Sequence, residues 1–398
     1  MSAAGPISMS APDLTAAEIE AVVSVLRTPY LSIGPQIKAF EQAMASFVGT
    51  AHAIAVSSGT SGLHLAVIAA GVGEGDLVLT TPFSFVASAN CVLYERAVPI
   101  FVDIDPHTLN LDPALVTAAA DDLARGGDAA NRWLPPTILH SPSSTHQLKA
   151  ILPVDAFGQP ADYDAIGEVA RRHNLVVIED ACEAIGAEYK GRQAGTLGDV
   201  GVFAFYPNKQ MTTGEGGVIV TERDEWDALF RSLRNQGRDV FDAWLNHSRL
   251  GYNYRLDEMS AALGLAQLGR IEELLAKRER VAGMYNERLR QVDGVTIPYV
   301  APTTTRTSWF VYVIRLAPEV DRKQVMAALE ERGVPSRPYF TPIHLQPFYA
   351  QRFGYRRGDF PATEAAGDTC LALPFSSVMS EEQVDYVCRA LKEVVVRA

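Results

Sequence analysis

Short apolar runs alternate with helix-length segments along the first 221 residues of the chain. The runs lie at Ala53–Val56, Leu77–Thr80, Val98–Val102, Ile151–Val154, Leu175–Ile178, Gly201–Phe205 and Gly217–Thr221. Strands that alternate with helices are typical of an α/β fold, so we expect a mainly parallel central sheet with helices on both faces. Thr15 and Glu18 have the spacing of a capping box, which predicts an N-terminal helix that ends before Pro29.

The second half of the chain has a different pattern. From Leu256 to about Val292, apolar residues return at three- and four-residue spacing, which predicts one long helix between two domains. The remainder predicts a smaller C-terminal α+β domain, with a strand at Trp309–Leu316, a helix near Asp321–Arg332 and a last helix from Ser380. We therefore expect a large domain over residues 1–255, an interdomain helix over 256–292 and a small domain over 293–398.

Composition excludes several classes of protein. The chain has 398 residues and a formal net charge of −12, which argues against a nucleic-acid binder. Its four cysteines are scattered without a CxxC pair, so neither a disulfide framework nor a zinc site is indicated. The N-terminus lacks the pattern of a signal peptide, and no apolar run approaches the ~18 residues of a membrane helix. We expect a cytoplasmic protein with no membrane contact and no bound metal.

Three segments carry candidate chemistry. Lys209 lies between a predicted strand and a glycine-rich turn, and Asp180 follows the apolar run that ends at Ile178. Farther upstream, the turn Ser57–Gly62 joins a strand to a helix, whose free N–H groups can hold a phosphate. A lysine that forms a Schiff base, a carboxylate for a pyridine nitrogen and a phosphate cradle together point to pyridoxal phosphate.

Each of these signals is weak alone. A lysine beside a strand is mostly a solvated charge, and an aspartate after a strand is often the cap of the next helix. The turn Ser57–Gly62 is also what an ordinary N-cap looks like. The order of the three segments along one chain is much harder to obtain by chance.

The chain resembles the DegT/DnrJ/StrS family of nucleotide-sugar aminotransferases over nearly its whole length. The resemblance rests on LSIGPQIKAFEQAMASFVG, SSGTSGLHLAV, TPFSFVASANCVLYERAVPIFVDID, VIEDACEAIGAEYKG, FAFYPNKQMTTGEGG, LGYNYRLDEMSAALGLAQL and SRPYFTPIHLQPFY. It implies the fold type I architecture of aspartate aminotransferase, with pyridoxal phosphate as the cofactor and its pyridoxamine form as an intermediate.

The resemblance also implies roles for individual residues. Lys209 matches the lysine that binds the cofactor, Asp180 the partner of the pyridine nitrogen, and Phe85 the aromatic that stacks on the ring. Asn253 matches an asparagine that reaches the phosphate of the neighbouring subunit, which implies a homodimer with shared active sites. The phosphate turn corresponds to Ser58, Gly59, Thr60 and Ser61.

Three positions depart from the family pattern. Ala204 stands where many relatives carry a serine that binds the phosphate, and Asp155 stands where histidine is common. Glu183 replaces a glutamine or histidine near the cofactor 3-hydroxyl and resembles the GDP-perosamine synthase branch. Asp155, Arg337 and His344 are candidate substrate contacts, although a surface charge and a packed histidine are equally good interpretations of the last two.

Residues 123–149 form an insertion relative to the family. The segment is rich in Gly, Pro and Ser, and we expect a loop. Its histidines, His140 and His146, have no acidic or cysteine partner at ligand spacing, so we expect solvated side chains and not a metal site.

The resemblance implies a transaminase with two half-reactions. An amino acid, by resemblance L-glutamate, gives its amine to the cofactor, which passes it to a keto group on a nucleotide-linked sugar. Two alternatives stay open, namely an aminocyclitol-forming enzyme that acts on a keto-inositol and a non-catalytic regulatory relative. Lys209 argues against the related sugar dehydratases, in which histidine replaces this lysine.

Overall fold

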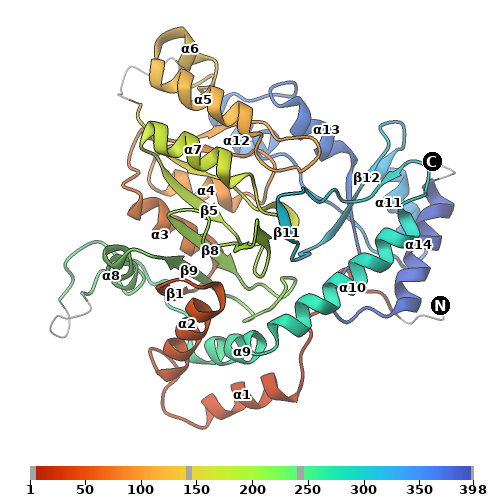
Figure 1. The fold of residues 1–398 in the computed structure, drawn as a ribbon, viewed down its shortest axis with the longest axis horizontal. Helices are drawn as coiled ribbons and strands as arrows, with labels where there is room; N and C mark the ends of the chain where they lie inside the picture. The colour runs from red at the N-terminus through yellow and green to blue at the C-terminus, as the bar shows by residue number, and fades with distance from the viewer. Residues whose placement is uncertain (1–5, 140–145, 240–245, 396–398) are drawn as a thin grey trace.

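The computed structural model describes residues 6–139, 146–239 and 246–395. A seven-stranded sheet lies at the centre of the larger part of the molecule (Figure 1), with the strand order β1-β9-β8-β5-β4-β2-β3. Strand β9 is antiparallel to β1 and β8, and the other neighbours are parallel. The strands are β1 (His52–Val56), β2 (Leu77–Thr80), β3 (Val98–Phe101), β4 (Leu148–Leu152), β5 (Val176–Asp180), β8 (Val200–Ala204) and β9 (Gly217–Thr221). Each predicted apolar run forms one of these strands, and the predicted α/β class is confirmed.

Helices cover both faces of this sheet. Successive side chains of a strand point to opposite faces, and in β2 the side chains of Leu77 and Leu79 pack in the core with α5 and α7, whereas Val78 packs in the core with α3 and α8. The strands are mostly apolar on both sides because both faces of the sheet are buried. The helices of this part are α1 (Ala16–Leu26), α2 (Pro35–Val48), α3 (Gly59–Ala69), α4 (Ala87–Tyr94), α5 (Pro113–Arg125), α6 (Gly127–Asn131), α7 (Tyr163–His173) and α8 (Asp224–Leu233), with a 3-10 turn at Ala156–Gly158.

The capping box at the start of α1 is confirmed. Thr15 Oγ1 accepts a hydrogen bond from Ala17 N, and the Glu18 carboxylate accepts one from Thr15 N at 2.7 Å. The helix ends at Leu26, before Pro29, as the sequence predicts.

The long interdomain helix is instead two helices, α9 (Glu258–Leu268) and α10 (Ile271–Leu289), so the prediction of one helix is wrong. The break falls at Gly269 and Arg270. Glycine is unfavourable inside a helix, and the backbone of Arg270 leaves helical geometry, with φ −114°. Its guanidinium is bound by Asp13 and Glu18 on the N-terminal segment. Ion pairs between Arg270 and the N-terminal segment therefore stabilise the break between the two helices.

Helix α10 runs from the central sheet toward a second, four-stranded antiparallel sheet (Figure 1), whose order is β10-β12-β14-β13. The core there joins side chains of α10, α11 and α14 to β12 and β14. The predicted strand and both predicted helices of this part are confirmed. The elements are β10 (Val295–Thr296), β12 (Tyr312–Leu316), β13 (Arg337–Pro338), β14 (Cys370–Leu373), α11 (Arg322–Glu330), a 3-10 turn (Ile343–Leu345), α12 (Pro347–Phe353), α13 (Pro361–Thr369) and α14 (Glu381–Val395).

A three-stranded sheet completes the fold, with β6 (Glu188–Tyr189) between β7 (Arg192–Gln193) and β11 (Thr304–Arg306). It joins segments from both halves of the chain. Within the described ranges, no helix is long and apolar enough to cross a bilayer. The exact domain boundaries stay a prediction.

The predicted insertion is only partly a loop. Residues 127–131 form α6, and Trp133 Nε1 donates to Asp122 Oδ2 at 2.9 Å, which fixes this segment against α5. His140 lies outside the described residues. His146 Nδ1 lies 3.0 Å from Gly75 O, so it is not simply solvated. In the described part of the chain, no group of three His, Cys, Asp or Glu residues could hold a metal ion.

Candidate active site

The predicted chemistry converges on one cavity of about 440 Å³ at the carboxyl edge of the central sheet. Strands β1, β2, β5 and β8 run in the same direction and end at this edge, so the residues that follow them meet there. The predicted site residues that line the cavity are Ser58, Gly59, Thr60, Phe85, Asp180, Glu183 and Lys209, and Ala204 joins them.

The N-terminus of α3 forms one wall of the cavity. Ser58 is the N-cap, and its hydroxyl accepts from Ser61 N at 3.1 Å, while Ser61 Oγ accepts from Ser58 N at 3.0 Å. Ser61 is therefore buried in the capping box and does not itself line the cavity. The N–H groups of Gly59 and Thr60, at the first two helical positions, have no acceptor within the helix and favour an anion.

Gly59 is required here by close packing. A Cβ at this position would lie 2.7 Å from Ala204 Cβ and 2.8 Å from Cys182 Sγ. Such distances are too short for carbon contacts, so a larger residue would push the helix start away from β8. The same contact places Ala204 directly beside the helix N-terminus.

Asp180 is the last residue of β5 and is 4% exposed. Burial raises the pKa of its carboxyl group, while hydrogen bonds from Cys182 and Ser88 and the positive charge of Lys209 act in the opposite direction. Cys182 N donates to Asp180 Oδ1 at 3.2 Å. A buried carboxylate needs a cationic or N–H partner to stay charged, and a protonated pyridine nitrogen supplies both.

Lys209 reaches the cavity from a turn after β8, where its N–H donates to Tyr206 O at 2.9 Å. Its side chain is 12% exposed, and Nζ lies 3.5 Å from Glu183 Oε1. Nζ also lies 3.7 Å from the centroid of the Phe310 ring, a cation–π contact. These two contacts hold the amine inside the cavity.

Glu183 is a buried carboxylate opposite that amine. Burial raises its pKa, and the Lys209 charge and the Phe157 N–H, which donates to Oε2 at 2.9 Å, act in the opposite direction. One carboxylate oxygen is thus fixed by the backbone and the other faces Lys209. The observed contact of Glu183 is with the amine and not with a second acid.

The sequence analysis missed several cavity residues. Phe310, Tyr339 and Phe340 form an aromatic wall from the C-terminal part, and Ser88 on α4 supports Asp180. The aromatic wall lies about a hundred residues beyond Lys209 along the chain, and no spacing signal links the two segments. In the sequence, Ser88 looks like a residue at the start of a helix and gives no sign of a contact with Asp180. In the structure its Oγ also lies 2.7 Å from Ser84 Oγ.

Two predicted substrate contacts are wrong in this structure. Asp155 is fully buried, and its Oδ1 accepts from Ala161 N at 3.0 Å and from Tyr163 OH at 2.9 Å, away from the cavity. His344 is also fully buried, with Nε2 3.0 Å from Glu364 Oε1. Both side chains serve internal packing, so neither lines the substrate entrance.

Arg337 and Asn253 lie outside the cavity for different reasons. Arg337 is exposed on β13, near Tyr339, and its Nη1 donates to Ser336 O at 2.8 Å. Asn253 is exposed, and its backbone pairs with Asn235. Within one chain, Asn253 contributes nothing to the cavity, so its predicted role depends on a second subunit.

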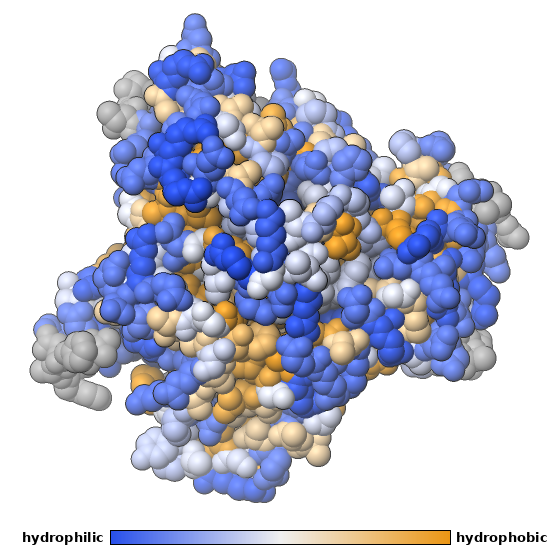
Figure 2. Space-filling model, viewed as in Figure 1, coloured by the Kyte–Doolittle hydropathy of each residue, from blue (hydrophilic) through white to orange (hydrophobic). Residues whose placement is uncertain are grey.

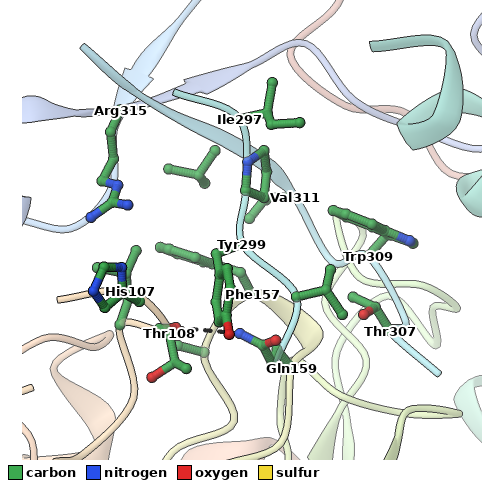
Figure 3. Close-up of a pocket in the computed structure, with 15 residues that line it drawn as sticks. His107, Thr108, Phe157, Gln159, Ile297, Tyr299, Thr307, Trp309, Val311 and Arg315 are labelled. Carbon is green, nitrogen blue, oxygen red and sulfur yellow. Dashed lines mark hydrogen bonds between the residues drawn. The ribbon is translucent and has the colours of Figure 1, made fainter. Parts of the chain in front are cut away.

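A much smaller cavity, of about 40 Å³, lies beyond Phe157 (Figure 3). In this view His107, Tyr299 and Arg315 face it, and Gln159 Nε2 donates to Thr108 O at 3.4 Å. It has room for little more than one or two water molecules. A cofactor or a sugar does not fit in this small cavity.

The residues of the large cavity fit pyridoxal phosphate. The N-terminus of α3 offers unpaired N–H groups to the phosphate, Asp180 offers a buried carboxylate to the ring nitrogen, and Lys209 offers the amine for the covalent link. Phe85 is 63% exposed and lies on the cavity wall, free to stack on a ring. Fold and site together define a fold type I enzyme that depends on pyridoxal phosphate.

Comparisons with known proteins agree with this class. Residues 12–392 match the model of the DegT/DnrJ/EryC1/StrS aminotransferase family. The chain is 42% identical to GDP-perosamine synthase of Caulobacter vibrioides, over 98% of both chains. The chain belongs to this family and is a pyridoxal-phosphate-dependent aminotransferase.

Solved structures show the same fold. DesV of S. venezuelae, solved in complex with a ketimine intermediate, has a TM-score of 0.86 and 31% identity over 99% of both chains. A sugar aminotransferase from Streptococcus pneumoniae in its PMP form, Spr1654, has a TM-score of 0.87 and 25% identity over 98% of this chain and 99% of its own. The predicted fold and cofactor are confirmed.

Proposed function

We propose that the enzyme transfers the amino group of L-glutamate to a keto group of a nucleotide-linked sugar, in the biosynthesis of an amino sugar for a polysaccharide or a glycosylated metabolite. The observation that carries the proposal is the meeting of Lys209, Asp180 and the α3 N-terminus in one cavity. The cavity volume of about 440 Å³ also accommodates a sugar beside a cofactor. The cytosol, where both substrates are available, is the proposed place of action.

Lys209 has two tasks in this proposal. Its amine would hold the cofactor in the resting enzyme and, when free, would take and return the proton at the substrate carbon. Glu183, 3.5 Å from Nζ, keeps the amine pointed into the cavity between these steps. The Phe310 ring excludes water from the other side of the amine.

Bound pyridoxal phosphate supplies the electron sink for this reaction. Asp180 strengthens the sink by holding a proton on the ring nitrogen, since a buried carboxylate and a cation stabilise each other's charge. Gly59 and Thr60 would hold the phosphate through their N–H groups, and Phe85 would stack on the ring.

The proposed sugar substrate is a GDP-linked keto sugar, because the chain is 42% identical to a GDP-perosamine synthase. The chain is most similar to that enzyme among the proteins compared above, and Glu183 matches its branch of the family. A nucleotide diphosphate is anionic, yet Lys209 is the only basic residue among the described residues that line the cavity, beside Asp180, Glu183 and Glu215. Cations for the diphosphate must therefore come from outside this set.

We propose that a second copy of the chain completes the site, in a homodimer with shared active sites. Asn253 is exposed on its own chain and is suited to donate from its amide to the phosphate in a neighbouring subunit. Exposed apolar side chains before, on and after α1 also need a cover, and Figure 2 shows an apolar area over α9, next to α1 in the view. These side chains are Leu14, Ile19, Leu26, Tyr30, Leu31 and Ile33.

The test is an amination assay with glutamate and a panel of keto substrates, read by mass spectrometry. The panel holds GDP-linked, dTDP-linked and UDP-linked keto sugars and a free keto-inositol. The proposal predicts amination of the GDP-linked sugar at the highest kcat/KM. Preferred amination of the keto-inositol would show the aminocyclitol alternative, and no amination by protein that carries its cofactor would favour a regulatory relative.

A further inference from the structure

Arg278 on α10 is a buried cation that binds four backbone carbonyl groups. It is 2% exposed, and burial lowers the pKa of its guanidinium to about 10, so it stays charged at neutral pH. No carboxylate of the described residues bonds it. Its two terminal nitrogens instead donate to the carbonyls of Asn208, Lys209, Trp309 and Phe310.

The fork of the guanidinium joins two chain segments. Nη2 donates to Lys209 O at 2.8 Å, and Nη1 donates to Trp309 O and Phe310 O, each at 3.1 Å. The two segments lie about a hundred residues apart in sequence. They are also the two segments that meet in the cavity, where Lys209 Nζ lies over the Phe310 ring at 3.7 Å.

The backbone at Trp309 is shaped for this contact. Successive carbonyls of an extended strand point to opposite sides, so one nitrogen could not bind both Trp309 O and Phe310 O in a regular strand. Trp309 has φ +50°, a left-handed conformation that is unfavourable for a large side chain. Glu279, the next residue on α10, accepts from the Trp309 indole at 2.5 Å and so holds this residue from a second side.

We propose that Arg278 is a positioning residue that joins the Lys209 segment to the Phe310 segment and thereby fixes the Lys209 amine over the Phe310 ring. The guanidinium acts through the two backbones and touches no reacting atom. A planar fork suits this task, since a lysine ammonium cannot span both segments with the same geometry. Gln210 provides a weaker second link, from its Nε2 to Ser308 Oγ at 2.7 Å.

The test compares Arg278→Met with Glu279→Ala, which loosens the Trp309 indole but leaves the guanidinium bonds to both chain segments. Arg278→Lys, which keeps the charge but not the fork, serves if the methionine variant does not fold. Four quantities are measured. The rate at which apo-protein captures pyridoxal phosphate, kcat and KM for glutamate are determined per folded active site, and the melting temperature is determined for each variant.

Misplaced reacting groups slow a reaction by about tenfold to a hundredfold. We expect that loss in kcat and in the capture rate for Arg278→Met, with a KM that changes little, and near-normal rates for Glu279→Ala. Phe310→Leu should slow cofactor capture less in the Arg278→Met variant than in the wild-type protein. The reason is that both substitutions disturb the same contact, that of the Lys209 amine with the Phe310 ring.

A lower melting temperature with normal rates per folded site would show that Arg278 only stabilises the fold and would overturn the proposal. Equal losses in Arg278→Met and Glu279→Ala would overturn it too. The inference rests on Lys209 as the reacting amine. If that assignment fails, the cofactor becomes attached to another residue in the wild-type protein, a result separate from any effect of Arg278.

Discussion

At the residue scale, the site depends on a few polar groups that burial makes sensitive to their partners. Asp180 and Glu183 are both nearly buried carboxylates, yet one faces the expected ring nitrogen and the other faces the Lys209 amine. Their environments assign them different tasks. Ala204 is the position where this chain has one donor fewer than the family pattern.

Asp180→Asn tests the ring-nitrogen partner. The amide keeps the shape but removes the negative charge that holds the nitrogen protonated, so kcat should fall by at least about a hundredfold. Cofactor occupancy, measured by absorbance, should stay close to that of the wild type because the phosphate cradle is untouched. Normal occupancy with an unchanged kcat would remove Asp180 from this role.

Ala204→Ser tests the phosphate cradle. A hydroxyl beside the α3 N-terminus should add a hydrogen bond to a charged group, worth about 1.5–3 kcal/mol. Cofactor loss during dialysis should then slow by about tenfold to a hundredfold. Ala204→Gly adds no donor and should lose cofactor no more slowly than the wild type. Equal loss rates for the serine variant and the wild type would contradict the predicted orientation.

At the element scale, the strands and the order of the site segments could be predicted because both depend on local pattern. Each apolar run forms a strand, and parallel strands bring their carboxyl ends to one edge, so Lys209, Asp180 and Gly59 meet. The break between α9 and α10 could not be predicted, because Arg270 is bound by Asp13 and Glu18 from the far end of the chain. Long-range contacts leave no periodic signal.

Asp155 shows the same limit at a single position. The family resemblance, in which histidine is common at this position, indicated a substrate contact, but the carboxyl turns inward toward Tyr163 and Glu179. His344 is buried, which agrees with the interpretation as a packed histidine, and Phe310, for which the sequence predicted no role, lines the cavity. Residue type alone does not tell which way a side chain points.

The buried pair of Asp155 and Glu179 predicts a pH dependence of stability. Burial raises the pKa of both carboxyls, and the Glu179 charge raises the pKa of Asp155 further. The folded protein therefore holds a proton that the unfolded chain releases above about pH 4, so this pair makes stability fall as pH rises above that value.

The Asp155→Asn variant needs no such proton, so its free energy of unfolding should fall less steeply as pH rises. The change in slope should reach up to about 1.4 kcal/mol per pH unit above about pH 5. Urea unfolding at several pH values measures it. Asp164→Asn is the control, because its ion pair with Lys190 lowers the Asp164 pKa and leaves this pH range unaffected. An unchanged slope in Asp155→Asn would show that the pair holds no extra proton.

At the scale of the whole molecule, Lys209 is the one basic residue among the described residues that line the cavity, too little positive charge for a nucleotide diphosphate, which is why we propose shared sites. Mixing Lys209→Ala with Asn253→Asp tests the sharing. Each parent should be inactive, since one lacks the amine and the other places a negative charge beside the phosphate. After subunit exchange, one site of each heterodimer has both wild-type residues, and activity should approach about half of wild type per heterodimer.

Subunit exchange itself is followed with two differently tagged chains. Folded parents that exchange subunits but recover no activity would contradict the shared site. Recovery without any heterodimer would point to contamination by one active parent and not to sharing.

The central claim is that Lys209 carries the cofactor, and the position of the covalent link tests it most directly. The holoenzyme is reduced with borohydride, which makes the link between lysine and cofactor permanent, and is then digested and sequenced by mass spectrometry. The chain has seven lysines, namely Lys38, Lys149, Lys190, Lys209, Lys277, Lys323 and Lys392. We expect the added cofactor mass on Lys209, and its loss in Lys209→Ala. Attachment at one of the other lysines, or a fully loaded enzyme with no attached mass, would contradict the account.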